Sequence, residues 1–404
     1  MFLLAPLSLC KQKRFIINQM DNKTIHKILT VNDHRIPMVI YDVDVIKRQK
    51  TSLDNLFKNV VKKFTIAYSY KTNTALGQTM RDLDCSFQVT SINHLRQVKQ
   101  LTNKKPFKIF FNSRNLTKKD LKEVIHGGVH LIINSRSQYD MVQELATKQR
   151  QKLQIGVRID TKSSPKNTFF KTVNTGLGLD YQEFKGLPRK SKCLEIVGLH
   201  AHIASQNTDL LSIEKGIKVL SRIFEQNNFN FRYLNLGGGF PIQYKNSVPT
   251  IKSFAEKIIP AIRKIQKPNP SLEFIIEPGR YIVGPAGYLF ARVNDIISNH
   301  GKIDVAVINC SVFSSVRDRI LSGYVIELPC VVFKKQKIET KKYLIVGSSP
   351  SSCDTFGKYV LPKIRIGDIL IFSHAGAYCL SNDDFTGVEK PQEFVWTGNH
   401  LLPI

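Results

Sequence analysis

The feature that most constrains the fold is an alternation of short apolar runs and longer amphipathic stretches between about residues 60 and 280. Eight runs have the length and composition of buried strands. They are Phe64–Ser69, Cys85–Val89, Phe107–Asn112, Val129–Ile133, Leu153–Ile159, Glu195–Ile203, Phe231–Leu236 and Leu272–Glu277. Because most gaps between them are long enough for helical crossovers, the pattern predicts an α/β fold with a (β/α)8 TIM-like barrel.

The segments between these runs have helical periodicity. Apolar residues recur at helical spacing in Leu116–His126, Ser137–Lys148, Leu210–Gln226 and Ile251–Lys267. Thr117 and Ser137 stand at positions where a hydroxyl can cap a helix, and we expect them to cap the first two of these helices.

From Tyr288 onward the sequence predicts strands without long helices, and therefore a C-terminal β-rich domain. The predicted strands are Tyr288–Ile297, Ile303–Asn309, Tyr324–Phe333, Tyr343–Val346, Asp368–Ser373 and Glu393–Thr397. The strand Pro37–Val43, which precedes the barrel, is expected to join this domain. We thus expect an N-terminal extension and strand in residues 1–44, the barrel in 45–285 and the β-domain in 286–404.

The composition is strongly basic. Among 404 residues, 59 are Lys or Arg and 32 are Asp or Glu, which gives a formal net charge of +27. Such a charge is typical of proteins that bind nucleic acid or membrane surfaces. The lysine pairs are spread along the chain, however, and no zinc-finger spacing or RNA-binding aromatic motif accompanies them. A solvated, lysine-rich surface is the favoured interpretation, and nucleic acid is not the expected partner.

Seven cysteines lie far apart without a CxxC pair, which favours reduced thiols in the cytoplasm and argues against a structural metal site. No apolar stretch is long enough to span a bilayer. The apolar segment Met1–Leu9 lacks a basic leader, so we interpret it as a non-functional or misassigned extension, with Met20 as an alternative start. A signal peptide is the other interpretation of this segment.

Chemically versatile side chains gather where the predicted strands end. Lys71 follows the first strand, His200 and His202 end the sixth, Gly237–Gly239 follow the seventh and Glu277–Arg280 follow the eighth. In a barrel these positions share the carboxyl-terminal rim, where active sites form. Each cluster also has a structural interpretation when taken alone, as a surface lysine, core histidines, a tight turn or an ion pair.

Together the clusters predict one cofactor. A glycine-rich loop exposes N–H groups to a phosphate, and a lysine can bind an aldehyde carbon. A buried carboxylate such as Glu277 can keep a pyridine nitrogen protonated, and a histidine can stack on the ring. A ligand with phosphate, aldehyde and pyridine groups is pyridoxal 5′-phosphate.

With these motifs in view, the chain resembles the barrel-fold PLP-dependent decarboxylases, the diaminopimelate and ornithine decarboxylase family with an alanine-racemase-like barrel. The resemblance covers nearly the whole chain. Its motifs are Tyr68-Ser69-Tyr70-Lys71-Thr72-Asn73, Gly198-Leu199-His200-Ala201-His202-Ile203-Ala204-Ser205-Gln206, Leu236-Gly237-Gly238-Gly239-Phe240-Pro241, Glu277-Pro278-Gly279-Arg280-Tyr281 and Ala375-Gly376-Ala377-Tyr378.

The resemblance implies roles for individual residues. Lys71 would bind the cofactor covalently, His202 would stack on its ring and Glu277 would face its nitrogen. The implied cofactor-binding residues are Lys71, Arg158, His202, Ser205, Gly237, Gly238, Gly239, Glu277, Arg280 and Tyr378. The resemblance also implies a homodimer whose subunits complete each other's active sites.

The sequence departs from the family pattern at several positions. Gln88 stands where the family usually has an acid, and Ala204 replaces a glycine. Relatives carry a proton-donating cysteine where an ungapped comparison places Pro350. A three-residue slip would instead let Cys353 supply the thiol and Asp354 the adjacent acid. Cys353 is thus a candidate catalytic residue beside Lys71 and His202.

The substrate is predicted from the implied substrate-binding residues, which are Arg280, Arg317, Asp354 and Tyr378. Arg317 falls in a segment where diaminopimelate decarboxylases carry an arginine that grips the distal carboxylate, and a bidentate guanidinium suits that group. We therefore expect decarboxylation of a diaminopimelate-like amino acid. The alternatives are ornithine or lysine, or a siderophore precursor or amino acid bound to an acidic carrier protein. A PLP-binding or nucleic-acid-associated protein without decarboxylase activity is the least favoured alternative.

Overall fold

The computed structural model describes residues 20–102, 107–166, 170–171, 175–188, 191–226, 230–298, 303–333, 339–380 and 385–404. The segment Met1–Leu9, interpreted above as an extension, lies outside the described residues. The chain divides into two compact units. The first comprises Met1–Gln49, Gln243–Ser247 and Ile282–Ile404, and the second comprises Lys50–Ile242 and Val248–Tyr281.

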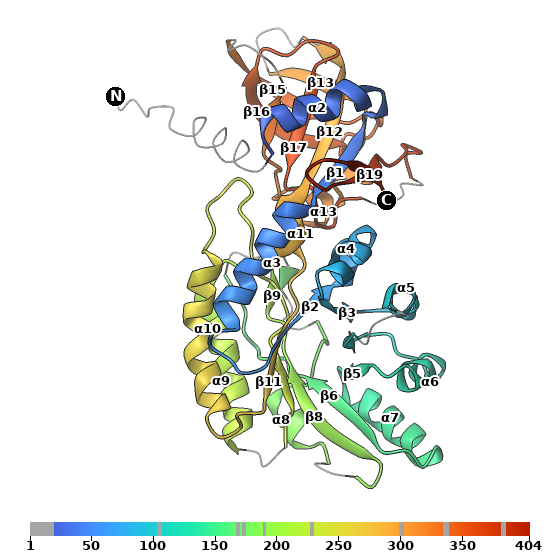
Figure 1. The fold of residues 1–404 in the computed structure, drawn as a ribbon, viewed down its shortest axis with the longest axis vertical. Coiled ribbons are helices and arrows are strands. Elements are labelled where there is room, and N and C mark those ends of the chain that lie inside the picture. The colour runs from blue at the N-terminus through green and yellow to red at the C-terminus, as the bar shows by residue number, and fades with distance from the viewer. Residues whose placement is uncertain are drawn as a thin grey trace. The chain divides into compact units, whose positions relative to one another are not determined.

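The second unit contains a closed barrel of parallel strands in the order β10-β11-β2-β3-β4-β5-β6-β8. Figure 1 labels β2, β3, β5, β6, β8 and β11 of this barrel. The strands are β2 (Phe64–Ser69), β3 (Ser86–Val89), β4 (Ile109–Phe111), β5 (His130–Ile133), β6 (Leu153–Arg158), β8 (Leu194–His200), β10 (Tyr233–Asn235) and β11 (Glu273–Ile276). Each falls on one predicted apolar run, so the predicted barrel is confirmed. A two-stranded pair of β7 (Phe170–Lys171) and β9 (Ala204–Ser205) accompanies it.

Helices connect most of the barrel strands. They are α4 (Gly77–Asp82), α5 (Ile92–Thr102), α6 (Lys118–His126), α7 (Arg136–Lys148), α8 (Tyr181–Lys185), α9 (Leu210–Gln226) and α10 (Ile251–Gln266), and α3 (Val43–Phe57) precedes β2. Thr117 caps α6 as predicted, in a reciprocal capping box with Asp120. The predicted cap of α7 is wrong. Ser135 has the extended backbone of a cap and accepts the Gln138 N–H, whereas Ser137 already lies inside the helix.

Tyr233 fills the middle of the barrel interior together with Phe110, Ile132 and Ile275. Glycines on the neighbouring strands make room for it, because a Cβ at Gly156 or Gly198 would overlap the tyrosine ring or its hydroxyl. The barrel is therefore a packed core, and its chemistry is confined to the rim.

The first unit is built on a nine-stranded sheet. Its strands are β1 (Met38–Asp42), β12 (Gly287–Ile297), β13 (Asp304–Ile308), β14 (Cys330–Val332), β15 (Thr340–Val346), β16 (Thr355–Pro362), β17 (Ile369–Ser373), β18 (Gln392–Trp396) and β19 (Leu401–Pro403). β1 pairs antiparallel with β12 and parallel with β18, so the strand that precedes the barrel is part of this sheet. The C-terminal β-rich architecture is confirmed.

Short helices complete the first unit. They are α2 (Asn22–Asn32), α11 (Arg280–Val283), α12 (Val312–Ser315) and α13 (Arg317–Leu321). α11 begins at the last residues of the second unit. Ile25, Ile28 and Leu29 of α2 pack in an apolar cluster with residues of β1, β12, β17 and β18. No helix in the described ranges has both the length and the hydropathy needed to cross a membrane.

Three strands of the first unit differ from the prediction. Of the run Tyr324–Phe333, only Cys330–Val332 is a strand. The carbonyl oxygens of Tyr324 and Ile326 accept hydrogen bonds from the Arg319 guanidinium, so they are not available to a neighbouring strand. The sequence pattern predicts neither β16 nor β19. Gly357, Lys358 and Pro362 interrupt the apolar pattern of β16, and β19 has only three residues.

Candidate active site

The segments that carry Lys71 and Glu277 meet at the ends of β2 and β11. The Ser69 N–H donates to the Pro278 carbonyl at 3.2 Å, and a Cβ on Gly279 would overlap the Thr72 hydroxyl. Lys71 follows β2 directly, and its side chain is exposed. The structure thus brings two of the predicted clusters into contact through their backbones.

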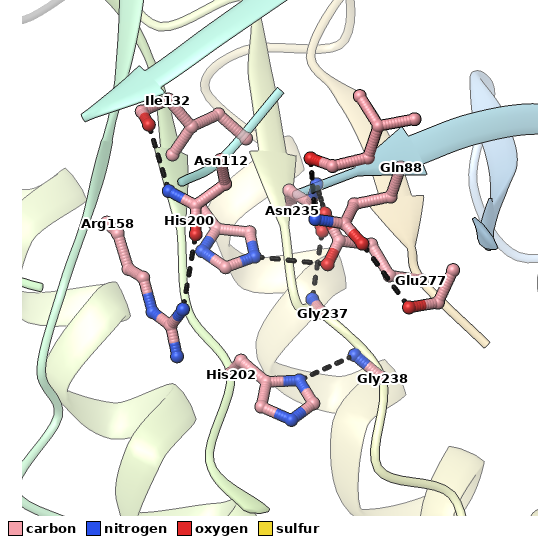
Figure 2. A network of polar contacts seen from close by, with 12 residues as sticks. Gln88, Asn112, Ile132, Arg158, His200, His202, Asn235, Gly237, Gly238 and Glu277 are labelled. Atoms are coloured by element: carbon pink, nitrogen blue, oxygen red, sulfur yellow. Dashed lines mark hydrogen bonds and ion pairs between the residues drawn. The ribbon is translucent and has the colours of Figure 1, made fainter. Parts of the chain in front are cut away.

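Glu277 is the centre of a buried polar network (Figure 2). Asn235 donates its Nδ2–H to Glu277 Oε1 at 2.7 Å, and His200 Nε2 lies 3.2 Å from Oε2. The Glu277 N–H donates to the Gly237 carbonyl at 2.7 Å, and the Gly237 N–H donates to Asn235 Oδ1 at 2.9 Å. These bonds form a closed ring that fixes the carboxylate against the glycine-rich loop.

The network keeps Glu277 ionised although it is buried. Burial by itself would raise the pKa of Glu277, but the charge and hydrogen bond of His200, the hydrogen bond from Asn235 and the charge of Arg158 outweigh it. The net result is a pKa below the usual range of a glutamate. A buried carboxylate that stays negative suits a protonated pyridine nitrogen.

His202 contacts the same loop. Its Nδ1 accepts the Gly238 N–H at 3.1 Å, so the proton of the neutral ring is on Nε2. Burial, followed by the charges of Arg158, Lys71 and His200, lowers the pKa of His202 well below its usual value. The ring is therefore neutral at physiological pH, and Lys71 is close enough to influence it.

The glycine-rich loop needs its glycines. Gly237 and Gly239 have φ values of 64° and 99°, which side chains rarely adopt, and a Cβ at Gly239 would overlap the Ala204 carbonyl. The Gly237 and Gly238 N–H groups are used inside the site. Within the described part of the chain nothing accepts the Gly239 N–H, which leaves it as a donor for an anion.

Arg158 ends β6 as a buried cation. Its Nη1 donates to Asn112 Oδ1 at 3.2 Å, and Asn112 is held by the Ile132 carbonyl and Asn134. The buried Nε atom of Arg158 has no hydrogen-bond partner among the described residues. Burial lowers the pKa of this guanidinium to about 10, so it remains charged near neutral pH. An unsatisfied buried donor at the rim fits an oxygen-bearing, anionic ligand such as a phosphorylated cofactor.

Ser205 and Arg280 belong to the same unit as these residues. Ser205 is half-buried in β9, which directly follows His202 and Ile203, and Arg280 is buried at the start of α11. Their predicted contacts with phosphate and substrate stay predictions. Gln88, at the position where the family usually has an acid, is buried and accepts the Ser69 hydroxyl at 3.3 Å.

The first unit brings Arg317 and Tyr378 together. The N–H groups of Arg317 and Asp318 donate to the carbonyls of Cys379 and Tyr378, each at 3.0 Å. The Arg317 side chain is exposed, and Tyr378 is half-buried with a φ of 55°. These contacts fix the start of α13 against the segment that carries the tyrosine.

Asp354 and Cys353 lie in the loop between β15 and β16. Both oxygens of the buried Asp354 carboxylate accept backbone N–H groups, from Val312 at 2.7 Å and Ser349 at 3.0 Å. Cys353 is exposed, as is Pro350. The predicted contact of Asp354 with substrate and the predicted catalytic role of Cys353 stay predictions.

Sequence reasoning missed two asparagines of the site. Asn235 binds Glu277, and Asn112 binds Arg158. Asn112 ends the predicted strand Phe107–Asn112, and Asn235 is the second-to-last residue of the predicted strand Phe231–Leu236. Barrels place functional side chains at these rim positions, and that position is the signal that could have identified them. His200 was noted at the rim but given no role.

The described residues contain no cluster of three or more His, Cys, Asp or Glu side chains that could hold a metal. The barrel with its glycine-rich loop and ionised Glu277, together with the β-rich first unit, instead fits a protein that holds a phosphorylated pyridine cofactor. Residues 43–284 match the family described as the pyridoxal-binding domain of pyridoxal-dependent decarboxylases. The chain therefore belongs to this family and is a carboxy-lyase that uses pyridoxal 5′-phosphate.

Several similar proteins are named diaminopimelate decarboxylase. The diaminopimelate decarboxylase of Methanocaldococcus jannaschii is 30% identical over 339 residues, which cover 79% of this chain and 76% of the relative. That of Campylobacter jejuni is 26% identical over 361 residues, covering 85% and 86%. A crystal structure of the enzyme from M. jannaschii superposes with a TM-score of 0.83 at 24% identity, over 93% of this chain and 90% of that chain, and shows the same fold.

Proposed function

We propose that this decarboxylase acts on a diaminopimelate-like amino acid and releases carbon dioxide and a lysine-like product. The proposal rests mainly on Arg317. Its side chain is exposed, and backbone hydrogen bonds hold the residue beside the segment that carries Tyr378. A guanidinium binds a carboxylate through two parallel hydrogen bonds, which selects substrates with a second, distal carboxylate. The names of the relatives support the same substrate class.

The barrel residues have complementary proposed roles. Lys71 binds the cofactor covalently, the Glu277 carboxylate faces its ring nitrogen, and the neutral His202 ring lies against the ring face. Arg158, Ser205, Gly239 and the rest of the glycine-rich loop bind its oxygens. When bound, pyridoxal 5′-phosphate supplies an electron-withdrawing ring that takes up the electron pair left by the departing carbon dioxide.

A comparison with ornithine supports the proposed preference for a substrate with a distal carboxylate. A substrate whose distal end is an ammonium group alone, such as ornithine, offers no carboxylate to Arg317 and needs an anionic partner for the ammonium. Asp354 is the candidate acid of the β15–β16 loop, and both of its oxygens are already bound to backbone N–H groups. We therefore propose that a substrate with a distal carboxylate is preferred over one that ends in an ammonium group alone.

We further propose that Cys353 returns the proton to the product and that the enzyme is a homodimer with shared active sites. Mixing Lys71→Ala and Cys353→Ala variants, each inactive alone, tests both ideas together. Recovery of part of the wild-type activity is expected, and no recovery contradicts sharing of the active sites between subunits.

The described cysteines are free thiols, which supports a reducing, cytoplasmic location.

The function itself is tested with a substrate panel. Purified protein is assayed for carbon dioxide and products with diaminopimelate, ornithine, lysine and conjugated diamino acids. Lysine formed from diaminopimelate, and lost in Lys71→Ala, is expected. Turnover of conjugates alone, including amino acids on an acidic carrier protein that the +27 charge would attract, contradicts the proposal.

A further inference from the structure

His200 is a buried histidine at the barrel rim, and among the described residues its side chain has one hydrogen-bond partner, Glu277. It ends β8 and is 1% exposed. Its Nε2 lies 3.2 Å from Glu277 Oε2, and its buried Nδ1 has no hydrogen-bond partner among the described residues. Because the Glu277 carboxylate is ionised, it accepts the bond, and His200 Nε2 carries the donated proton.

The two oxygens of Glu277 are held in different ways. Asn235, which binds Oε1, is itself oriented by the Gly237 N–H, so this bond belongs to the ring that shapes the glycine-rich loop. His200 binds Oε2 from a separate strand and takes no part in that ring. Figure 2 shows the two donors reaching the carboxylate from different strands. Loss of His200 thus leaves the loop's own hydrogen bonds in place.

We infer that His200 is a positioning residue that acts on the cofactor through Glu277. Its Nε2–H holds Oε2 and stabilises the negative charge, so that the carboxylate binds a protonated ring nitrogen more strongly. This inference rests on the proposed role of Glu277 but not on the identity of the amino-acid substrate. Hydrogen bonds to charged groups are strong enough for the effect to be measurable.

The test compares two cofactors. Apoprotein is titrated with pyridoxal 5′-phosphate and with its carbocyclic analogue, in which a CH group replaces the ring nitrogen, and binding is followed by absorbance. His200→Ala is expected to lower the affinity for pyridoxal 5′-phosphate about tenfold or more. The affinity for the analogue is expected to change less than about twofold, since it has no nitrogen for Glu277 to bind.

Three further variants sharpen the comparison. His200→Gln keeps an N–H donor and should recover much of the lost affinity. In a Glu277→Gln background, His200→Ala should no longer distinguish the two cofactors. His130→Gln, a change at another barrel-strand histidine that stacks on Phe110, should leave the ratio of the two affinities unchanged.

Equal losses of affinity for both cofactors in His200→Ala would show a purely structural role and overturn the inference. Unchanged affinity for both would overturn it as well. Because no amino acid takes part in these titrations, their outcome is independent of the substrate panel that tests the proposed function.

Discussion

Arg317 and Arg319 lie two residues apart in α13, but the Arg319 guanidinium is buried and hydrogen-bonded whereas that of Arg317 is exposed. The Arg319 guanidinium is buried and donates to the carbonyls of Thr355 and Ile326, each at 2.7 Å. The Arg317 side chain is exposed and has no hydrogen bond or ion pair within the described ranges. One arginine thus holds the fold of its unit, and the other is available to a ligand.

Arg317→Gln is expected to raise the KM for diaminopimelate about tenfold to a hundredfold with a smaller effect on kcat, because a charge-assisted bidentate contact is lost. Steady-state kinetics measures this split. Arg365→Gln, which removes another exposed arginine of the same unit, serves as the control and should leave KM unchanged. A KM unaffected by Arg317→Gln would rule out the predicted role.

Arg319→Ala is expected to lower the free energy of unfolding by about 3 kcal/mol, because it leaves buried carbonyl oxygens without their donor. Urea denaturation monitored by circular dichroism measures the change. Arg317→Ala, two residues away, should alter the same free energy by less than about 0.5 kcal/mol. Similar losses in both variants would contradict the assignment of separate roles.

Gly238→Ala is expected to abolish tight cofactor binding, since the added Cβ would overlap the Glu277 carbonyl and push the loop away from the carboxylate. Titration of the apoprotein with pyridoxal 5′-phosphate measures the loss. Gly186→Ala is the matched change, because a Cβ there lies 3.4 Å from its nearest neighbour, the Glu183 carbonyl. Normal binding by Gly238→Ala would show that the loop is not closely packed there.

His374 gives the β-rich unit a predicted pH dependence. Burial lowers the pKa of His374 from 6.5 to about 4. Below pH 6.5 His374 becomes protonated in the unfolded chain, but in the folded chain it stays neutral until about pH 4. Acidification across this window therefore favours unfolding. The contribution is fully present above pH 6.5 and is lost as the pH falls through the window.

His374→Asn removes this titration while keeping a residue that tolerates the observed φ of 65°. The free energy of unfolding of the wild type should fall more steeply than that of the variant, by up to about 1.4 kcal/mol per pH unit between pH 6.5 and 4. Denaturant titrations at several pH values measure both slopes. Parallel slopes would mean that the His374 pKa is not depressed in the folded protein.

The barrel could be predicted because each of its strands is a continuous apolar run, as parallel strands buried on both faces must be. The rim position then predicted that Lys71 and Glu277 belong to one site, and the segments that carry them do meet in the structure. Contacts across the barrel could not be predicted in the same way. The pairing of Asn235 with Glu277, or of Asn112 with Arg158, depends on which strand ends face each other after closure.

The β-rich unit was less predictable, because side chains decide its backbone partners. The apolar pattern of Tyr324–Phe333 predicts a strand, but the Arg319 guanidinium donates hydrogen bonds to two carbonyl oxygens of this segment. Likewise, the apolar pattern gave no indication that the carboxylate of Asp354 would bind the backbone of Val312, from a distant part of the chain.

The central claim is that a distal carboxylate selects the substrate. The most direct measurement is kcat/KM for diaminopimelate, ornithine and lysine with the same preparation of wild-type protein and of Arg317→Gln. We predict that diaminopimelate is favoured at least about a hundredfold in the wild type and that most of this preference is lost in the variant. Equal kcat/KM values in the wild type, or a preference that survives Arg317→Gln unchanged, would contradict the claim.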